Sequence, residues 1–316
     1  MIVLKVQILN LNASLDHTGI LKHKEESNII RVDEVIELVG GKGVNVARVL
    51  QRLNFADYEL SNIIGGSVGT VIENKLKEEK IKAWNYSIRG NSRINYILVD
   101  EINNQIKVIN ENGPHITEKE KKQYLDQLFN WMKENQILVF AGSATTGFKR
   151  DDIRSILQKA KSKQMIVMVD LSEKYLSSSL QEDIDLIKIN AREFIDEFGE
   201  KYNSSFEDPR NFVDIIEKEN LSRIIITFGK EGALLFDDGV IWLGKVLKAF
   251  SNYSIGSGDS FLAGFVYGFV NKYPKNECLK LAMACGAANT LKYGAGVFNY
   301  RDVCNIKDKF ITVEKM

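Results

Sequence analysis

The sequence predicts an α/β fold: a single domain over residues 1–316, with a mostly parallel β-sheet flanked by helices and a small β-sheet lid. After Gly113-Pro114, apolar runs of strand length alternate with segments of helical periodicity, as in βαβ units. Two β-rich segments, at about 17–38 and 88–110, interrupt this alternation and favour a separate small sheet. A chain of 316 residues can form one large α/β domain with a small attachment.

The N-terminal part opens with an apolar alternation at 2–9, which predicts a strand, followed by a polar turn over 10–16. Asp16 then lies where parallel sheets bind ligands, just past the carboxyl end of a strand. Before residue 114 we further expect short strands at 29–32 and 35–36, a helix from Val44, strand 60–64, helix 69–80, an extended segment 81–88, and a hairpin with arms 93–99 and 106–109.

The remainder alternates regularly, which predicts βαβ units. Helices are expected at 117–133, 150–163, 209–219, 258–271 and 276–291, with a further one opening at Asn190. Strands are expected at 136–141, 165–170, 184–189 and 223–228, with a hairpin at 229–235. Residues 305–316 predict a last helical turn and a strand or tail.

The composition argues against several classes of protein. Lys+Arg and Asp+Glu both number 42, so there is no bulk attraction to nucleic acid or to an anionic membrane. The three cysteines show no CxxC spacing, which argues against a disulfide framework and against zinc. The start resembles a strand more than a signal peptide, and the apolar run 261–270 is too short to span a bilayer. We therefore expect a cytoplasmic protein.

Gly256-Ser257-Gly258-Asp259 precedes an apolar helical run and is the strongest functional motif. Glycines permit a tight turn, and the first amides of the helix that follows have no internal partners. Such a turn can hold a phosphate, and an adjacent carboxylate can accept a proton. The alternative is an ordinary loop in which Asp259 only caps the helix.

A second glycine turn, at 40–43, opens the helix that begins near Val44 and places Lys42 and Asn45 at its start. Lys42 is not part of a Gly-x4-Gly-Lys-Ser/Thr phosphate loop. The Gly256 turn also lacks the Gly-x-Gly-x-x-Gly pattern, because Phe261 occupies its last place. A nicotinamide oxidoreductase is therefore a distant alternative.

Three stretches carry a family resemblance: LNLNASLDHT at 9–18, GGKGVNVARVL at 40–50 and IGSGDSFLAGF at 255–265. Weaker support comes from SRIN at 92–95, AGS at 141–143, KINARE at 188–193 and TFGKEGALL at 227–235. The chain resembles the PfkB (ribokinase-like) sugar kinases, in the subgroup of 1-phosphofructokinase and tagatose-6-phosphate kinase. The order and spacing match from about residue 2 to residue 300.

The resemblance implies a ribokinase-like, Rossmann-type domain, a small β-sheet lid that forms a homodimer contact, and the use of ATP and Mg²⁺. It implies that Asp259 is the catalytic base and that Gly256, Ser257 and Gly258 form the anion hole. The implied substrate-binding residues are Asp16, Gly41, Lys42, Asn45 and Arg93, with Lys42 and Arg93 on the existing phosphate. The implied ATP-binding residues are Asn190, Gly229, Gly232, Gly258 and Asn289, and Glu193 is implied to organise Mg²⁺ mainly through water.

The implied reaction is ATP-dependent phosphorylation of a ketohexose phosphate, with fructose 1-phosphate as first choice and tagatose 6-phosphate as the alternative. A catalytically silent sugar-phosphate-binding regulator on the same fold stays open. Asp16, Lys42 and Arg93 each have a purely structural or solvent-exposed alternative, and Asn190 with Glu193 also matches a helix capping box. Ala144-Thr145-Thr146 replaces the usual Leu-Pro of the subgroup, so one wall of the sugar site differs.

Overall fold

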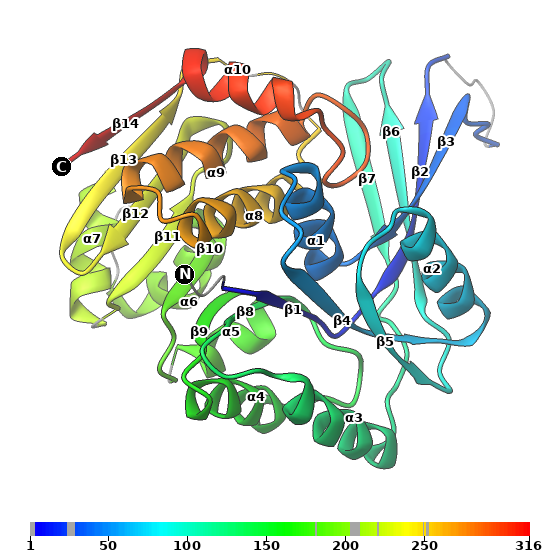
Figure 1. Ribbon diagram of the computed structural model, residues 1–316. Helices are drawn as coiled ribbons and strands as arrows, with labels where there is room; N and C mark the ends of the chain where they lie inside the picture. Colours follow the sequence, from blue (N-terminus) through cyan, green and yellow to red (C-terminus); the bar gives the residue numbers. More distant parts are fainter. Residues whose placement is uncertain are drawn as a thin grey trace.

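The computed structural model describes residues 4–23, 29–180, 182–202, 209–219, 221–248, 250 and 253–316. Its main sheet has ten strands in the order β14-β13-β12-β11-β10-β9-β8-β1-β4-β5 (Figure 1). These are β1 (Val6–Asn10), β4 (Tyr58–Gly65), β5 (Ala83–Ile88), β8 (Ile137–Gly142), β9 (Ile166–Leu171), β10 (Leu186–Asn190), β11 (Arg223–Thr227), β12 (Gly232–Asp237), β13 (Val240–Val246) and β14 (Ile311–Lys315). In this order, the neighbouring strands from β5 through β4, β1, β8, β9 and β10 to β11 pair in parallel. The neighbouring strands from β11 through β12 and β13 to β14 pair antiparallel. The predicted α/β class is confirmed.

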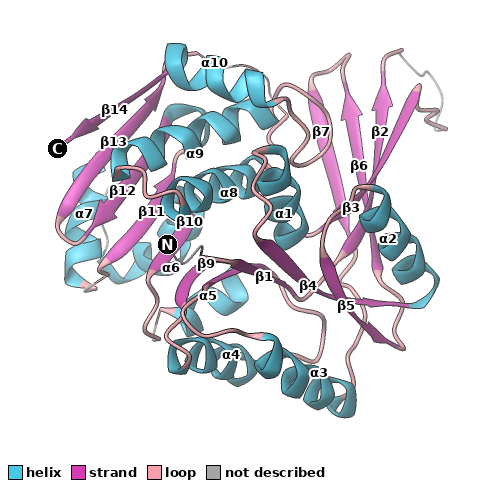
Figure 2. Ribbon diagram, in the orientation of Figure 1, coloured by secondary structure: helices cyan, strands magenta, loops and turns pink. Residues whose placement is uncertain are grey.

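Helices cover both faces of this sheet (Figures 1 and 2). They are α1 (Lys42–Arg52), α2 (Gly66–Glu78), α3 (Glu118–Trp131), α4 (Arg150–Ser162), α5 (Glu173–Ser179), α6 (Ala191–Tyr202), α7 (Pro209–Lys218), α8 (Ser257–Val270), α9 (Lys275–Asn289) and α10 (Tyr300–Phe310). One apolar core joins the sheet to α1, α8, α9 and α10, and a second joins it to α3, α4, α6 and α7. Alternate residues of a strand enter opposite cores: Val139 enters the first and Phe140 the second.

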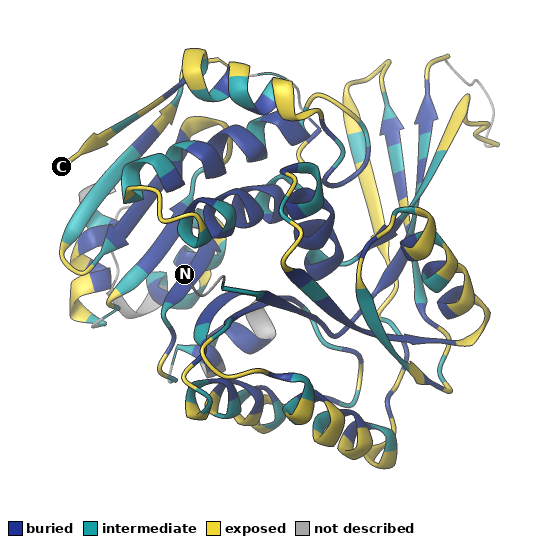
Figure 3. Ribbon diagram, in the orientation of Figure 1, coloured by how far each residue is buried: buried dark blue, intermediate teal, exposed yellow. Residues whose placement is uncertain are grey.

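A second sheet of four strands, in the order β3-β2-β6-β7, stands beside α1 and α2. Its strands are β2 (Ser14–Leu21), β3 (Glu34–Gly40), β6 (Arg93–Asp100) and β7 (Gln105–Asn110). Ile20, Ile97 and Val99 pack with Tyr253 of the main domain into a small third core. The outer strand β7 is exposed along most of its length (Figure 3).

Some predicted elements differ from the structure. Asp16 lies within β2 and not in a turn, because both edges of β2 are paired, with Leu38 of β3 and Asn95 of β6 opposite Asp16. The strand expected at 29–32 is absent: β3 begins at Glu34, and residues 24–28 lie outside the described residues. Helix α5 and strand β13 were not predicted as separate elements. Within the described ranges, no helix is long and apolar enough to cross a membrane.

Candidate active site

The glycine turn before α8 forms the centre of the site. Gly256 caps the helix with φ 80°, a left-handed conformation that glycine adopts without strain, and a Cβ here would overlap Ala295. The amide of Ser260 donates to the carbonyl of Gly256 at 2.9 Å and makes the first bond of the helical ladder. The amides of Gly258 and Asp259 precede that bond, so they lie at the positive end of the helix where an anion would bind.

Asp259 is the acid of this turn, and the residue is only 7% exposed. Asn45 of α1 donates its Nδ2 to Asp259 Oδ2 at 2.8 Å, which joins the two helix N-termini that the glycine motifs predicted. Burial raises the pKa of Asp259, while Lys42 and the hydrogen bond from Asn45 act against that rise. A buried carboxylate with a raised pKa is a stronger proton acceptor than an exposed one.

Two lysines share one buried carboxylate next to this turn. Asp170, at the end of β9, receives Lys42 Nζ and Lys188 Nζ on separate oxygens, each at 2.7 Å. Burial alone would raise the pKa of Asp170, but the two ammonium groups lower it to about 2. The carboxylates of Asp170 and Asp259 likewise outweigh burial and raise the pKa of Lys42.

Lys188 reaches the glycine turn itself, because a Cβ on Gly258 would lie 2.8 Å from Lys188 Nζ. Neither Lys188 nor Asp170 was predicted as a site residue. Both lie near the carboxyl ends of parallel strands, β10 and β9, and that position was the available signal.

Asp16 lies on the inner face of the small sheet within a polar cluster. Its Oδ1 accepts hydrogen bonds from Ser14 Oγ at 2.7 Å and from Asn95 Nδ2 at 2.8 Å. The missing side chain of Gly40 makes room for this carboxylate, since a Cβ there would overlap it. Gly41 follows with φ 109° and caps α1.

Arg93 lines a cavity of about 290 Å³ together with Asn12, Asn110, Ser143, Thr146 and Tyr175. It donates to the carbonyls of Asn12 and Glu111 at 3.2 and 3.3 Å. Among the described residues, Arg93 Nε and Asn12 Oδ1 have no hydrogen-bond partner. Lys42, which was expected to bind the same phosphate as Arg93, forms an ion pair with Asp170 in this structure.

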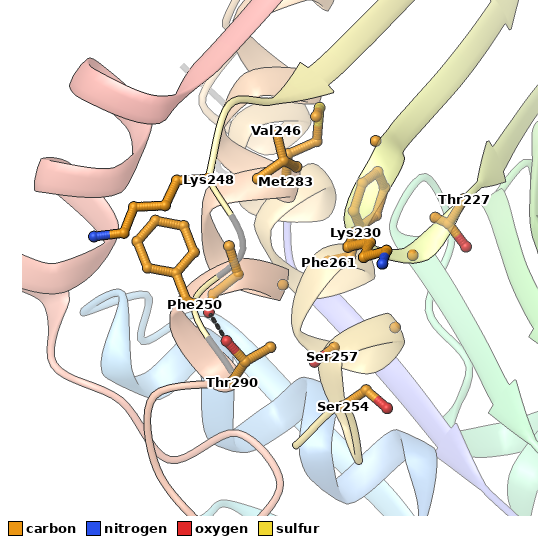
Figure 4. Close-up of a pocket in the computed structure, with 15 residues that line it drawn as sticks. Thr227, Lys230, Val246, Lys248, Phe250, Ser254, Ser257, Phe261, Met283 and Thr290 are labelled. Carbon is orange, nitrogen blue, oxygen red and sulfur yellow. Dashed lines mark hydrogen bonds between the residues drawn. The ribbon is translucent and has the colours of Figure 1, made fainter. Parts of the chain in front are cut away.

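A second cavity, of about 260 Å³, opens onto the same α8 turn. Phe250, Phe261 and Met283 supply apolar lining (Figure 4), and Ser257 and Gly258 close it toward the turn. Gly229 and Gly232, which were expected to bind the nucleotide, also line it. A Cβ at Gly229 would have no heavy atom within 4 Å, so this edge of the cavity is open.

Asn289, which was expected near the adenine, is fully buried and is not among the residues that line this cavity. Its Nδ2 donates to the carbonyl of Ile255 at 2.8 Å, and its Oδ1 accepts the amide of Gly296 at 2.7 Å. It therefore holds the α8 turn in place, while Ala287 and Thr290 beside it line the cavity.

Comparison with known proteins identifies the family. The sequence profile of the pfkB family carbohydrate kinases matches residues 5–300. The chain belongs to this family.

Relatives in the family carry two enzyme names. The chain is 31% identical to a 1-phosphofructokinase of Borreliella burgdorferi, over 91% of this chain and 92% of that protein. It is 28% identical to a tagatose-6-phosphate kinase of Staphylococcus epidermidis, over 92% and 94%. Phosphofructokinase-2 from Escherichia coli, solved with substrates and products, shares the fold with a TM-score of 0.88 at 23% identity, covering 96% of this chain and 98% of that one. The ribokinase-like fold expected from the sequence is confirmed.

Membership of this kinase family implies ATP and Mg²⁺, and the residues present fit both. The apolar cavity beside a helix N-terminus suits a nucleotide with its phosphates toward Gly258. Asn190 and Glu193 form a reciprocal capping box at α6, with Glu193 Oε2 accepting the amide of Asn190 at 3.0 Å. Glu193 Oε1 lies outside this box. A single carboxylate suits Mg²⁺, which takes few carboxylates and keeps several waters.

Proposed function

We propose that this pfkB-family kinase transfers the γ-phosphoryl group of ATP to a hydroxyl of a ketohexose phosphate. The first choice of substrate is fructose 1-phosphate, which would give fructose 1,6-bisphosphate. The adjacency of Gly258 and Asp259 carries the proposal. Gly258 lines the nucleotide cavity, and the next residue provides a buried carboxylate of raised pKa.

In this mechanism Asp259 removes the proton from the attacking hydroxyl, and it must be ionised to do so. Asn45 holds the carboxylate through its 2.8 Å bond. The amides of Gly258 and Asp259 and the ammonium group of Lys188 stabilise the negative charge of the transferring phosphoryl group. Bound Mg²⁺, held by Glu193 with Asn190 and water, would neutralise charge on the ATP phosphates.

The small sheet supplies the sugar contacts of the proposal. In the proposal Asp16, Gly41 and Asn45 bind sugar hydroxyls. The Asp16 side chain is held by Asn95, and the Asn45 side chain is held by its bond to Asp259. The guanidinium of Arg93 suits the phosphate already on the substrate, because it can only donate hydrogen bonds. Asn12 Oδ1, which has no hydrogen-bond partner among the described residues, is an acceptor and suits a sugar hydroxyl instead. Lys42 is paired with Asp170, and its positive charge contributes to the electrostatics of the site from that position. The sheet would act as a lid that excludes water during transfer.

Tagatose 6-phosphate is the second candidate substrate, favoured by the relatives named tagatose-6-phosphate kinase. ADP release with Mg²⁺-ATP should be measured across fructose 1-phosphate, tagatose 6-phosphate, fructose 6-phosphate, fructose and ribose. Turnover on one phosphorylated ketohexose supports the proposal and names the substrate. Turnover only on free sugars contradicts the role of Arg93, and binding of a sugar phosphate without any turnover favours a silent regulator.

We also propose that two copies of this kinase associate through the outer face of the small sheet. Val35, Tyr96 and Ile109 project from this face and are 61%, 46% and 65% exposed. Tyr96 and Ile109 are cross-strand neighbours, so their two exposed side chains lie next to each other on this face. Asp16 and Asn95 lie on the opposite face, so association would leave the site side free.

We place this kinase in the cytoplasm. Cys278, Cys285 and Cys304 are unpaired thiols, as expected of a protein kept in a reducing compartment.

A further inference from the structure

Arg48 of α1 is a completely buried charge, with 1% of its surface exposed. A guanidinium has five N–H donors and no acceptor, and every donor of Arg48 is used. Nε and Nη2 bind the carboxylate of Glu79 at 2.5 and 3.0 Å. Nη2 also donates to the carbonyl of Val39 at 2.7 Å, and Nη1 donates to the carbonyl of Ala295 and to Asn45 Oδ1, each at 3.0 Å.

The contact with Asn45 has a consequence for Asp259. Because Arg48 can only donate, Asn45 must turn its oxygen toward Arg48. The amide nitrogen of Asn45 then faces Asp259 and donates to Oδ2 at 2.8 Å. If the amide of Asn45 were turned the other way, its oxygen would face a carboxylate oxygen with no hydrogen between them.

We propose that Arg48 is a positioning residue for phosphoryl transfer. It fixes the orientation in which the Asn45 amide donates to Asp259 and stabilises the ionised carboxylate. The inference rests on the proposed role of Asp259 as the base. Arg48 also supports the turn from a second side. It binds the carbonyl of Ala295, the residue against which Gly256 packs.

The charges around Asp259 come from three other elements. Lys42 lies on α1, Asp170 on β9 and Lys188 on β10, and all three act on the pKa of Asp259. A substitution at Arg48 changes none of these groups. Glu79, the charged partner of Arg48, is 23% exposed, so water can reach it when the guanidinium is absent. Because the substitution also removes the guanidinium charge, the same substitution in an Asn45→Ala background separates the effect on Asn45 from the direct loss of charge.

The test compares Arg48→Met with Arg48→Lys. Lysine, like arginine, has donors only, so it keeps the orientation of Asn45 although it loses most of the other contacts. Arg52→Met is the matched control, because Arg52 lies one turn further along α1 and binds the carbonyl of Phe298 in the same loop. If Arg48→Met does not fold, Arg48→Gln replaces it, since an amide does not dictate which atom of Asn45 faces it.

The first readout is the pKa of Asp259 in the protein without substrates, from the carboxyl ¹³C signal that Asp259→Asn removes. Loss of a donor to the ionised form raises the pKa of a carboxyl group, so Arg48→Met should titrate about one pH unit higher than wild type. Arg48→Lys and Arg52→Met should titrate like wild type. Equal pKa values in Arg48→Met and wild type, or equal shifts in all three variants, would overturn the proposal.

The second readout is kcat in a double-mutant cycle with Asn45→Ala. Arg48→Met should lower kcat roughly tenfold to a hundredfold, the range of a hydrogen bond to a charged group, with little change in either KM. In the Asn45→Ala background the same substitution should change kcat by less than about twofold. Additive losses would indicate a purely structural role. Near wild-type turnover in Asp259→Asn would instead refute the base, and the titration would still test Arg48.

Discussion

At the scale of single residues, the carboxylate of Asp170 balances two ammonium groups beside the α8 turn. Lys42 and Lys188 would repel each other without it. Each ammonium group lies within hydrogen-bond distance of the Asp170 carboxylate. Asp170 is 1% exposed and Lys188 is 5% exposed, so neither can turn to water for compensation. The arrangement keeps a positive charge at Gly258 and fixes its position.

Asp170 should make stability fall in acid. Its pKa of about 2 in the folded chain lies below the ordinary value of about 3.9, so its contribution is complete above about pH 4 and is lost as the pH falls toward 2. Asp170→Asn should cost roughly 2–3 kcal/mol at pH 6 and progressively less below pH 4. Urea unfolding at several pH values measures this. The exposed Asp308→Asn serves as control, and a cost independent of pH would contradict the assignment.

Arg93→Ala should raise KM for the sugar phosphate by about tenfold or more, since it removes a charged donor from the anion. KM for ATP should not change, because Arg93 lines the cavity that lies apart from the nucleotide cavity. Initial-rate kinetics with each substrate varied in turn provide the measurement. Arg89→Ala, an exposed arginine nearby, is the control, and an unchanged KM for the sugar phosphate would return Arg93 to a structural role.

At the scale of elements, two glycine turns bring the N-termini of α1 and α8 together. The sequence predicted both turns and the alternation of the main sheet, because glycine spacing and apolar periodicity are local signals. It did not predict β2 at Asp16, because the polar residues of that strand face a site and break the apolar alternation. Lys188 and Asp170 were not predicted because they lie 18 residues apart in the sequence, on two different strands. Their pairing is visible only in three dimensions.

Gly256→Ala should destabilise the chain and misplace the turn. A Cβ would overlap Ala295 in addition to straining a residue with φ 80°. Gly239 has φ 82° and no heavy atom within 4 Å of a Cβ, so Gly239→Ala carries the conformational strain alone. We expect a loss of about 2 kcal/mol or more for the first and about 1 kcal/mol for the second, with kcat reduced only in the first. Equal effects in unfolding and kinetics would argue against a packed turn.

At the scale of the whole molecule, the proposed site draws on two sheets. The main sheet and α8 provide the nucleotide cavity and the base, and the small sheet provides Asp16 and Arg93. The small core of Ile20, Ile97, Val99 and Tyr253 joins the two parts close to the α8 turn. This division explains how one face of the small sheet can serve the site while the other is free to bind a second copy.

Tyr96→Asp with Ile109→Asp should abolish the proposed dimer, because burying two carboxylates in an apolar contact is costly. Light scattering should give a mass near twice 35.8 kDa for wild type and near 35.8 kDa for the variant. Leu247→Asp, at an exposed apolar residue of the main domain, should give the same mass as the wild type. A monomeric wild type would contradict the dimer and leave the catalytic account intact.

The most direct test of the central claim is kcat of Asp259→Asn with ATP and the sugar phosphate that the wild type turns over. The control is Asp302→Asn, because Asp302 also lies in the first turn of a helix and would share any loss due to helix stability alone. If Asp259 is the base, kcat falls at least about 10²-fold in Asp259→Asn, with ATP binding retained and the control unaffected. If Asp259 only caps α8, Asp259→Asn turns over at nearly the wild-type rate.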